Sequence, residues 1–192
     1  MHASSPNAST AFRNYAESYP AHVLLAEAFI QFARLGLAAF ERSHPSGHFT
    51  GSAWLVSADG ERVLLTHHRK LGRWLQLGGH ADGDVDLARV ALREAGEESG
   101  LSDLVVEHPI FDLDRHRIPA RGEEPEHWHY DVRHVVRAIG SEVFAASEES
   151  LALAWKSIRD IAVDVSADAS LQRMARKWLE RNQPDSSRHS WS

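Results

Sequence analysis

The chain contains no cysteine among its 192 residues. This absence excludes disulfide bonds, metal sites built from thiolates and catalysis by a thiol nucleophile. A chain without disulfides suits a reducing compartment, and we expect a cytoplasmic protein.

The sequence also lacks an excess of basic residues and a long apolar run. Its 21 Lys and Arg are outnumbered by 27 Asp and Glu, for a formal net charge of −6, and no basic cluster indicates a groove for a nucleic-acid polymer. The apolar stretch that begins at Val23 is interrupted by Glu27 and Arg34, so it predicts neither a membrane span nor a signal peptide. A small anionic ligand would need a local positive field, most simply from a bound metal ion.

Hydrophobic residues make up 43% of the chain, which suits one globular domain with terminal additions. Residues 1–17 are rich in Ser, Ala and Asn without periodicity, and we predict a flexible lead-in there. Residues 18–46 predict a helical extension, either one helix or two broken near Gly36. Residues 47–163 form the predicted main domain, and residues 164–192 a closing amphipathic helix and tail. The wide apolar stripe of the extension is compatible with a monomer or a homodimer.

Apolar runs separated by turn residues predict the strands of the main domain. The runs over 49–56 and 62–66 flank a turn and predict a hairpin. Further strands are predicted over the ranges 74–77, 104–113, 133–139 and 151–156. Strands interrupted by one helix and closed by another favour an α/β fold, with a mixed β-sheet sandwiched between helices.

An acidic helix follows a glycine turn in the middle of the chain. At about 100° per residue, Glu94, Glu97 and Glu98 share one arc of this helix. Three carboxylates on one arc repel one another unless a cation lies among them, and hard divalent ions prefer such oxygen ligands. Gly100 predicts the left-handed end of the helix. A solvated acidic face is the alternative interpretation.

The whole pattern around this helix is more specific than its carboxylates alone. Gly79 stands fourteen positions before Arg93, and the run after it reads Arg-Glu-Ala-Gly-Glu-Glu-Ser-Gly-Leu over residues 93–101. This resembles the Nudix box, Gly-x5-Glu-x7-Arg-Glu-U-x-Glu-Glu-x-Gly-U, where U is aliphatic. Val85 stands where the box has its first Glu, so Asp84 and Asp86 are the candidates to pair with the box arginine.

The resemblance implies the Nudix fold over about 47–163 and a metal-dependent hydrolase of a diphosphate linkage. It implies that Glu94, Glu97, Glu98 and the Gly79 carbonyl hold Mg²⁺ or Mn²⁺, with Glu97 or Glu98 also able to act as the base. Arg93 is then expected to orient a glutamate of the helix. The expected partner is a small-molecule diphosphate.

Polar residues outside the box supply further candidates. A strand period of two puts His127, His129 and Asp131 on one face, where they could bind a transition metal, contact a diphosphate or form an ordinary polar strand face. Arg73, close to the glycine turn, is an equally open candidate for a phosphate contact. Two more glutamates are candidate bases by the same resemblance, with helix capping as the alternative: Glu148 and Glu149.

Two other functions are compatible with a Nudix fold. One is a non-hydrolytic nucleotide-binding module, for which Val85 is the single hint, although all three box-helix glutamates argue against it. The other resembles isopentenyl diphosphate isomerase, whose catalysis uses a cysteine that this chain does not have.

Overall fold

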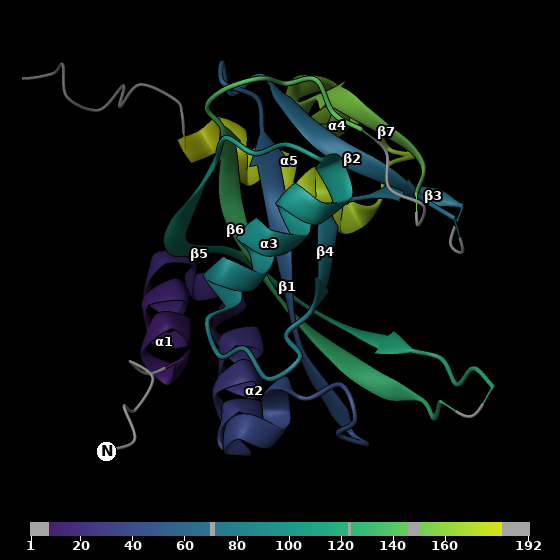
Figure 1. Cartoon of the computed structure of the whole chain (residues 1–192). Coiled ribbons are helices and arrows are strands. Elements are labelled where there is room, and N and C mark those ends of the chain that lie inside the picture. The colour runs from purple at the N-terminus through teal and green to yellow at the C-terminus, as the bar shows by residue number, and fades with distance from the viewer. Residues whose placement is uncertain (1–7, 70–71, 123, 146–149, 182–192) are drawn as a thin grey trace, which may run out of the picture.

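A seven-stranded mixed β-sheet forms the centre of the structure, and helices cover both of its faces (Figure 1). The structure, a computed structural model, describes residues 8–69, 72–122, 124–145 and 150–181. The predicted α/β class, with a mixed sheet between helices, is confirmed. No helix of these described residues is long and apolar enough to cross a membrane.

The strands are β1 (Gly47–Val56), β2 (Arg62–His68), β3 (Arg73–Leu75), β4 (Leu77–His80), β5 (Leu104–Ile118), β6 (His127–Ala138) and β7 (Ser150–Ser157). The α-helices are α1 (Ala8–Ser18), α2 (Val23–Ala33), α3 (Leu87–Ser99), α4 (Ile158–Val163) and α5 (Ala169–Arg181). Two 3₁₀ helices, η1 (Pro20–His22) and η2 (Gly36–Phe40), flank α2.

Strand β1 organises the sheet because it pairs with three other strands. It runs parallel to β6 over its whole length and antiparallel to β4, and all ten of its residues are buried. The predicted hairpin with β2 exists, but β1 and β2 are in register at Val56 and Val63, next to the turn. Beyond this point β4 pairs with the same edge of β1, and β2 pairs with β7.

Alternation along β1 separates the two faces of the sheet. Trp54 packs with the core under α4 and α5, whereas Leu55 packs with the core under α3. Gly51 lets α3 approach closely, since a Cβ atom there would lie 2.7 Å from Cγ1 of Val90. Helix α3 begins at Asp86, whose side chain accepts a hydrogen bond from the Arg89 amide, and it ends at the left-handed Gly100, as predicted.

The predicted flexible lead-in is wrong for its second half, because residues 8–17 belong to α1. Phe12 and Tyr15, three positions apart, are buried in the core, and two aromatic residues in eleven leave too weak a period to be seen in the sequence. The helices α1 and α2 and the segment η2 cover one side of β1 and β6, where Phe32 stacks on Tyr130 with ring centroids 3.9 Å apart. The predicted break near Gly36 is present, with φ of +65° at that residue.

Strands β5 and β6 form a long hairpin that projects beyond the rest of the sheet (Figure 1). Strand β5 continues to Ile118, five residues past the predicted end at Leu113. Four of the five added residues are polar, and their pairing with β6 rather than an apolar alternation keeps them extended.

Candidate functional site

A cleft of about 550 Å³ opens between strand β4, the C-terminal half of α3 and the β5–β6 hairpin. Gly78, Gly79, Glu94 and Glu98 line one side of it. Residues from the sheet line the other side: Thr50, Ser52, Gln76, His80, His116, His129 and Asp131. The two glycines, which lie in strand β4 and not in the predicted turn, share this cleft with two of the three predicted metal-ligating glutamates and part of the predicted histidine face.

The two glycines bring the helix carboxylates close to β4. A Cβ atom on Gly79 would lie 2.4 Å from Oε2 of Glu94, so the Glu94 carboxylate occupies the space that a side chain would fill. The amide of Gly78 donates a hydrogen bond of 2.8 Å to Oε1 of Glu98. Glu97, in contrast, is exposed and does not line the cleft.

Arg93 holds Glu94 in place. Its guanidinium donates hydrogen bonds of 2.7 Å to Oε1 of Glu94 and 2.9 Å to the carbonyl of His80. The hydrogen bond with Glu94 raises the pKa of Arg93, whereas burial raises the pKa of Glu94 above its usual value despite that partner. A cation beside Glu94 would favour its charged form.

The N-terminal helices explain why an apolar residue, Val85, occupies the position of the first glutamate of the box. Its side chain packs against the aromatic cluster that includes Phe12, so the position faces apolar atoms instead of Arg93. Neither acidic neighbour replaces the missing glutamate: Asp84 pairs with Arg89 through hydrogen bonds that include one of 2.8 Å, and Asp86 caps α3. The expectation that one of them pairs with Arg93 is wrong, and Glu94 fills that role.

The parallel register of β1 and β6 builds the sheet side of the cleft. His48 lies opposite His129, and Thr50 lies opposite Asp131. Strand β5 extends both rows, with His116 beside His129 and Asp114 beside Asp131. The result is a row of imidazoles next to a row of carboxylates on one face.

Asp131 is buried and is held from several sides. It accepts hydrogen bonds from Thr50 at 3.0 Å, Ser52 at 2.7 Å and Gln76 at 3.2 Å. Nε of Arg133 lies 2.7 Å from the same carboxylate and forms a buried ion pair with it. This saturation makes Asp131 a fixed part of the cleft floor.

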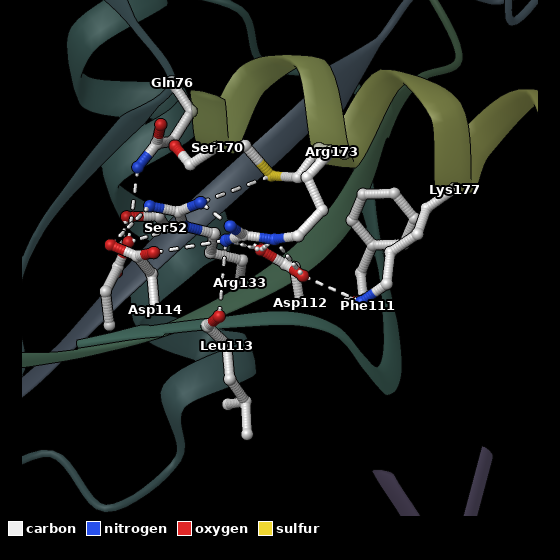
Figure 2. Close-up of polar contacts among 12 residues, drawn as sticks. Ser52, Gln76, Phe111, Asp112, Leu113, Asp114, Arg133, Ser170, Arg173 and Lys177 are labelled. Carbon is white, nitrogen blue, oxygen red and sulfur yellow. Dashed lines mark hydrogen bonds and ion pairs between the residues drawn. The ribbon is translucent and has the colours of Figure 1, made fainter. Parts of the chain in front are cut away.

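A buried charge network continues from Asp131 toward α5. Arg133 also contacts Asp112 and Asp114, each at 3.4 Å, and Arg173 of α5 approaches the same two carboxylates (Figure 2). Lys177 adds an ion pair of 2.7 Å with Asp112. Burial alone would raise the pKa of Asp112, but the hydrogen bond from Arg173 and the nearby cations hold it below its usual value. The network fixes β5, β6 and α5 to one another beneath the cleft.

Burial keeps three imidazoles of this face, those of His48, His80 and His129, neutral at pH 7. Burial, reinforced by neighbouring histidines, lowers the pKa of His48 to about 4 and that of His129 to about 2. Burial also lowers the pKa of His80. His48 is 1% exposed, and neither of its ring nitrogens has a hydrogen-bond partner among the described residues. An unsatisfied buried polar group costs roughly 1–3 kcal/mol.

Other predicted residues lie elsewhere. Arg73 pairs with Asp168 at 3.1 Å and does not line the cleft. His127 is buried beside His129, whereas Glu148 and Glu149 lie outside the described residues. Sequence reasoning missed the cleft residues Arg42 and His80, and it missed His48, which lies beside His129 behind the cleft lining. The positions of His48 and His80 depend on the pairing of β1 with β6 and β4, which no local pattern encodes.

The family follows from a match to the model described as NUDIX domain, which covers residues 48–180. The chain belongs to the Nudix family. The match extends through most of α5, beyond the predicted end of the main domain at residue 163. No curated protein matches the chain.

Solved structures share the fold at low sequence identity. An Ap4A hydrolase from C. elegans in a binary complex has a TM-score of 0.55 and 17% identity, covering 69% of this chain and 96% of its own. A dihydroneopterin triphosphate pyrophosphohydrolase from E. coli has a TM-score of 0.53 and 15% identity, covering 69% and 95%. The Nudix hydrolase RenU from M. smegmatis has a TM-score of 0.52 and 21% identity, covering 72% and 89%.

Proposed function

We propose that this chain hydrolyses a diphosphate linkage in a nucleoside diphosphate derivative or a similar small phosphoanhydride, with Mg²⁺ or Mn²⁺ as its cofactor. The observation that carries the proposal is the meeting of Glu94, Glu98 and Gly79 at one wall of the cleft in a member of the Nudix family. The names of the structural neighbours, an Ap4A hydrolase and a triphosphate pyrophosphohydrolase, agree with this class of reaction.

The residues present suit a hard divalent ion. Glu94 and Glu98 offer carboxylate oxygens at a partly buried wall, the Gly79 carbonyl is a third donor, and exposed Glu97 on the same helix is a fourth. When bound, such an ion neutralises the diphosphate and lowers the pKa of a coordinated water.

The chain's own residues position the carboxylates and accept the proton. Arg93 fixes the orientation of Glu94, and the Gly78 amide fixes that of Glu98. Glu97 or Glu98 accepts the proton of the attacking water, and the phosphoanhydride bond then breaks at phosphorus. His129 and Asp131 face the same space and form its substrate side.

The size of the cleft favours a small molecule. A volume of about 550 Å³ lies in the usual range of small-ligand sites. A monomer or a homodimer stays a prediction. A cytoplasmic location, where soluble nucleotides are found, stays a prediction.

The direct test incubates a panel of nucleoside diphosphate derivatives with Mg²⁺, with Mn²⁺ and with chelator. It measures the nucleoside monophosphate that hydrolysis releases, together with the second product, which is a phosphate ester or, where the other group is itself phosphate, phosphate or pyrophosphate. We expect turnover of at least one member with either ion and none with chelator. The variant Glu98→Gln should lose that turnover. Tight binding of a panel member without metal-dependent product release would instead support a non-hydrolytic binding module.

A further inference from the structure

Three histidines meet on the face of the sheet that forms the cleft. His48 comes from β1, His80 from the end of β4 and His129 from β6, and one ring nitrogen of each lies within 4.8 Å of the other two. The ring centroids of the three are 4.7–5.4 Å apart. Three neutral imidazoles converging on one point form the ligand set of many transition-metal sites.

The second observation is the state of His48. Its side chain is almost fully buried, yet both ring nitrogens lack a hydrogen-bond partner among the residues that the structure describes. Buried polar atoms are normally paired. The ring is directed at His80 and His129, so a metal ion between the three would give it the missing partner.

A neighbouring histidine is already oriented as a ligand. Nδ1 of His127 lies 2.9 Å from the Pro125 carbonyl, which can only accept a hydrogen bond, so this nitrogen is the protonated one. Nε2 therefore carries a lone pair, and it lies 3.3 Å from Nε2 of His129. Two nitrogens at about 2.0–2.1 Å from one tetrahedral zinc ion are separated by about 3.3–3.4 Å. A backbone carbonyl that fixes the ring in this way is the usual outer partner of a metal-bound histidine.

We propose that His48, His80 and His129 bind a divalent transition-metal ion of the zinc class, at a site separate from the carboxylate site of α3. Neutral imidazole suits zinc, cobalt, nickel and copper, whereas magnesium prefers oxygen ligands. His127 lies beside this group, with its Nε2 atom 3.3 Å from Nε2 of His129.

The location gives this ion an electrostatic role. His80 and His129 line the cleft opposite Glu94 and Glu98, and the described lining includes one arginine, Arg42, which is paired with Asp82. A divalent ion held by neutral ligands adds its full charge to this acidic cleft. An anionic ligand would then meet positive charge on the histidine side as well as on the carboxylate side.

The first test uses the wild-type chain without a histidine tag. Titration with Co²⁺ should produce the visible absorption of a nitrogen-bound tetrahedral ion with a stoichiometry of one. X-ray absorption of the zinc-loaded protein should show the scattering of at least three imidazole rings. Oxygen scattering without imidazole, or no Co²⁺ band, would overturn the proposal.

Variants separate the two sites. His129→Gln and His48→Gln should each weaken Co²⁺ binding by roughly 100-fold or more, since even loss of an outer-shell partner costs about 10–100-fold. The exposed His108→Gln is the matched control and should bind as the wild type does. Glu98→Gln should keep the Co²⁺ band while losing Mg²⁺-dependent turnover.

Retention of the band in the folded His129→Gln variant, or its loss in Glu98→Gln, would contradict the histidine site. Either result leaves the proposed hydrolysis untouched, because turnover with Mg²⁺ is measured independently. Circular dichroism of each variant reports whether it folds. His129 is less buried than His48, so the His129→Gln substitution disturbs the packing less.

Discussion

Because Gly79 has no side chain, the Glu94 carboxylate can lie close to β4. A methyl group there would displace the Glu94 carboxylate, which now lies where Cβ would be. We expect Gly79→Ala to fold, because the obstructing atoms are at the end of a flexible side chain, and to lose about 100-fold in kcat/KM, the rough cost of a 1 Å misplacement. Hydrolysis of the best panel substrate measures the loss.

Gly96→Ala on α3 is the control for this prediction. Its Cβ atom would meet the Leu101 carbonyl at 3.5 Å, an ordinary contact. Removing a glycine from a helix interior should stabilise the fold by up to about 1 kcal/mol and leave turnover unchanged. Equal turnover in both alanine variants would show that Gly79 does not position Glu94.

Glu97 offers a second prediction at the residue scale. Its side chain is exposed, so Glu97→Gln should change the free energy of unfolding by no more than about 0.5 kcal/mol. If Glu97 is a ligand or the base, turnover should fall by roughly 10²–10⁴-fold. Steady-state kinetics with Mg²⁺ and urea unfolding, measured on the same preparation, separate the two effects. Unchanged turnover would remove Glu97 from the site and leave Glu94 and Glu98.

Residues of the site differ in how far the sequence alone reveals them. Glu94, Glu97 and Glu98 are neighbours on one helix, so their spacing fixes a common arc, although it does not show that Glu97 is exposed. His48 and His129 are far apart in the chain and meet through the parallel register of β1 and β6. The hydrophobic period of a single strand does not encode the register between β1 and β6, because that register depends on which strand pairs with β1.

At the scale of elements, α1 behaves as part of the core. Phe12 is fully buried and contacts Phe29 and Phe49 with ring centroids 5.4 Å and 5.9 Å away. We expect Phe12→Ala to lower the free energy of unfolding by roughly 3–5 kcal/mol. Urea unfolding followed by tryptophan fluorescence measures this change. Leu24→Ala, at a side chain that is 77% exposed on α2, should change it by about 0.5 kcal/mol or less.

The charge network between the sheet and α5 gives a prediction for a second interface. Asp112 is fully buried among Arg133, Arg173 and Lys177. Asp112→Asn removes one buried negative charge from beside these three cations. We therefore expect the free energy of unfolding to fall by roughly 3–5 kcal/mol.

Glu126→Gln is the matched control for that loss. It removes an exposed pair with Arg117 and should cost at most about 1 kcal/mol. A similar cost for the two changes in a denaturant titration would mean that the buried network adds nothing to stability.

Helices and strands were predictable from the sequence where each had a clear local pattern of apolar or capping residues. The apolar run of β1 and the glycine that ends α3 are local signals, so both were predictable, whereas the cap at Asp86 was not predicted. Helix α1 was missed because its stability comes from two aromatic residues that fill a distant core, and β5 was predicted too short because its last residues are polar and are held by pairing. Tertiary contacts decide such elements.

For the whole molecule, the buried histidines predict a loss of stability in acid. The pKa of His48 is about 4 in the folded chain and 6.5 without burial, so between these values the unfolded chain binds more protons. Stability is fully present above pH 6.5 and falls as the pH drops toward 4, by up to roughly 3 kcal/mol from His48 alone. The lowered pKa of His129 adds to the loss.

Melting temperatures from pH 7.5 to 4, in the presence of chelator, measure this dependence. His48→Gln should flatten the curve between pH 6.5 and 4, whereas His108→Gln should not. Asp112 also has a lowered pKa, but its contribution is lost below its ordinary value of 3.8, outside that window. A flat wild-type curve would mean that the histidines are not held neutral.

The contact between the two ends of the described chain has a consequence for synthesis. Nζ of Lys177 donates a 2.8 Å hydrogen bond to the Tyr15 hydroxyl, 162 positions earlier. At about 5–20 residues per second, a ribosome adds the lysine roughly 8–32 s after the tyrosine. During that interval the Tyr15 hydroxyl lacks this partner, so the link between α1 and α5 can form only when translation of the domain is nearly complete.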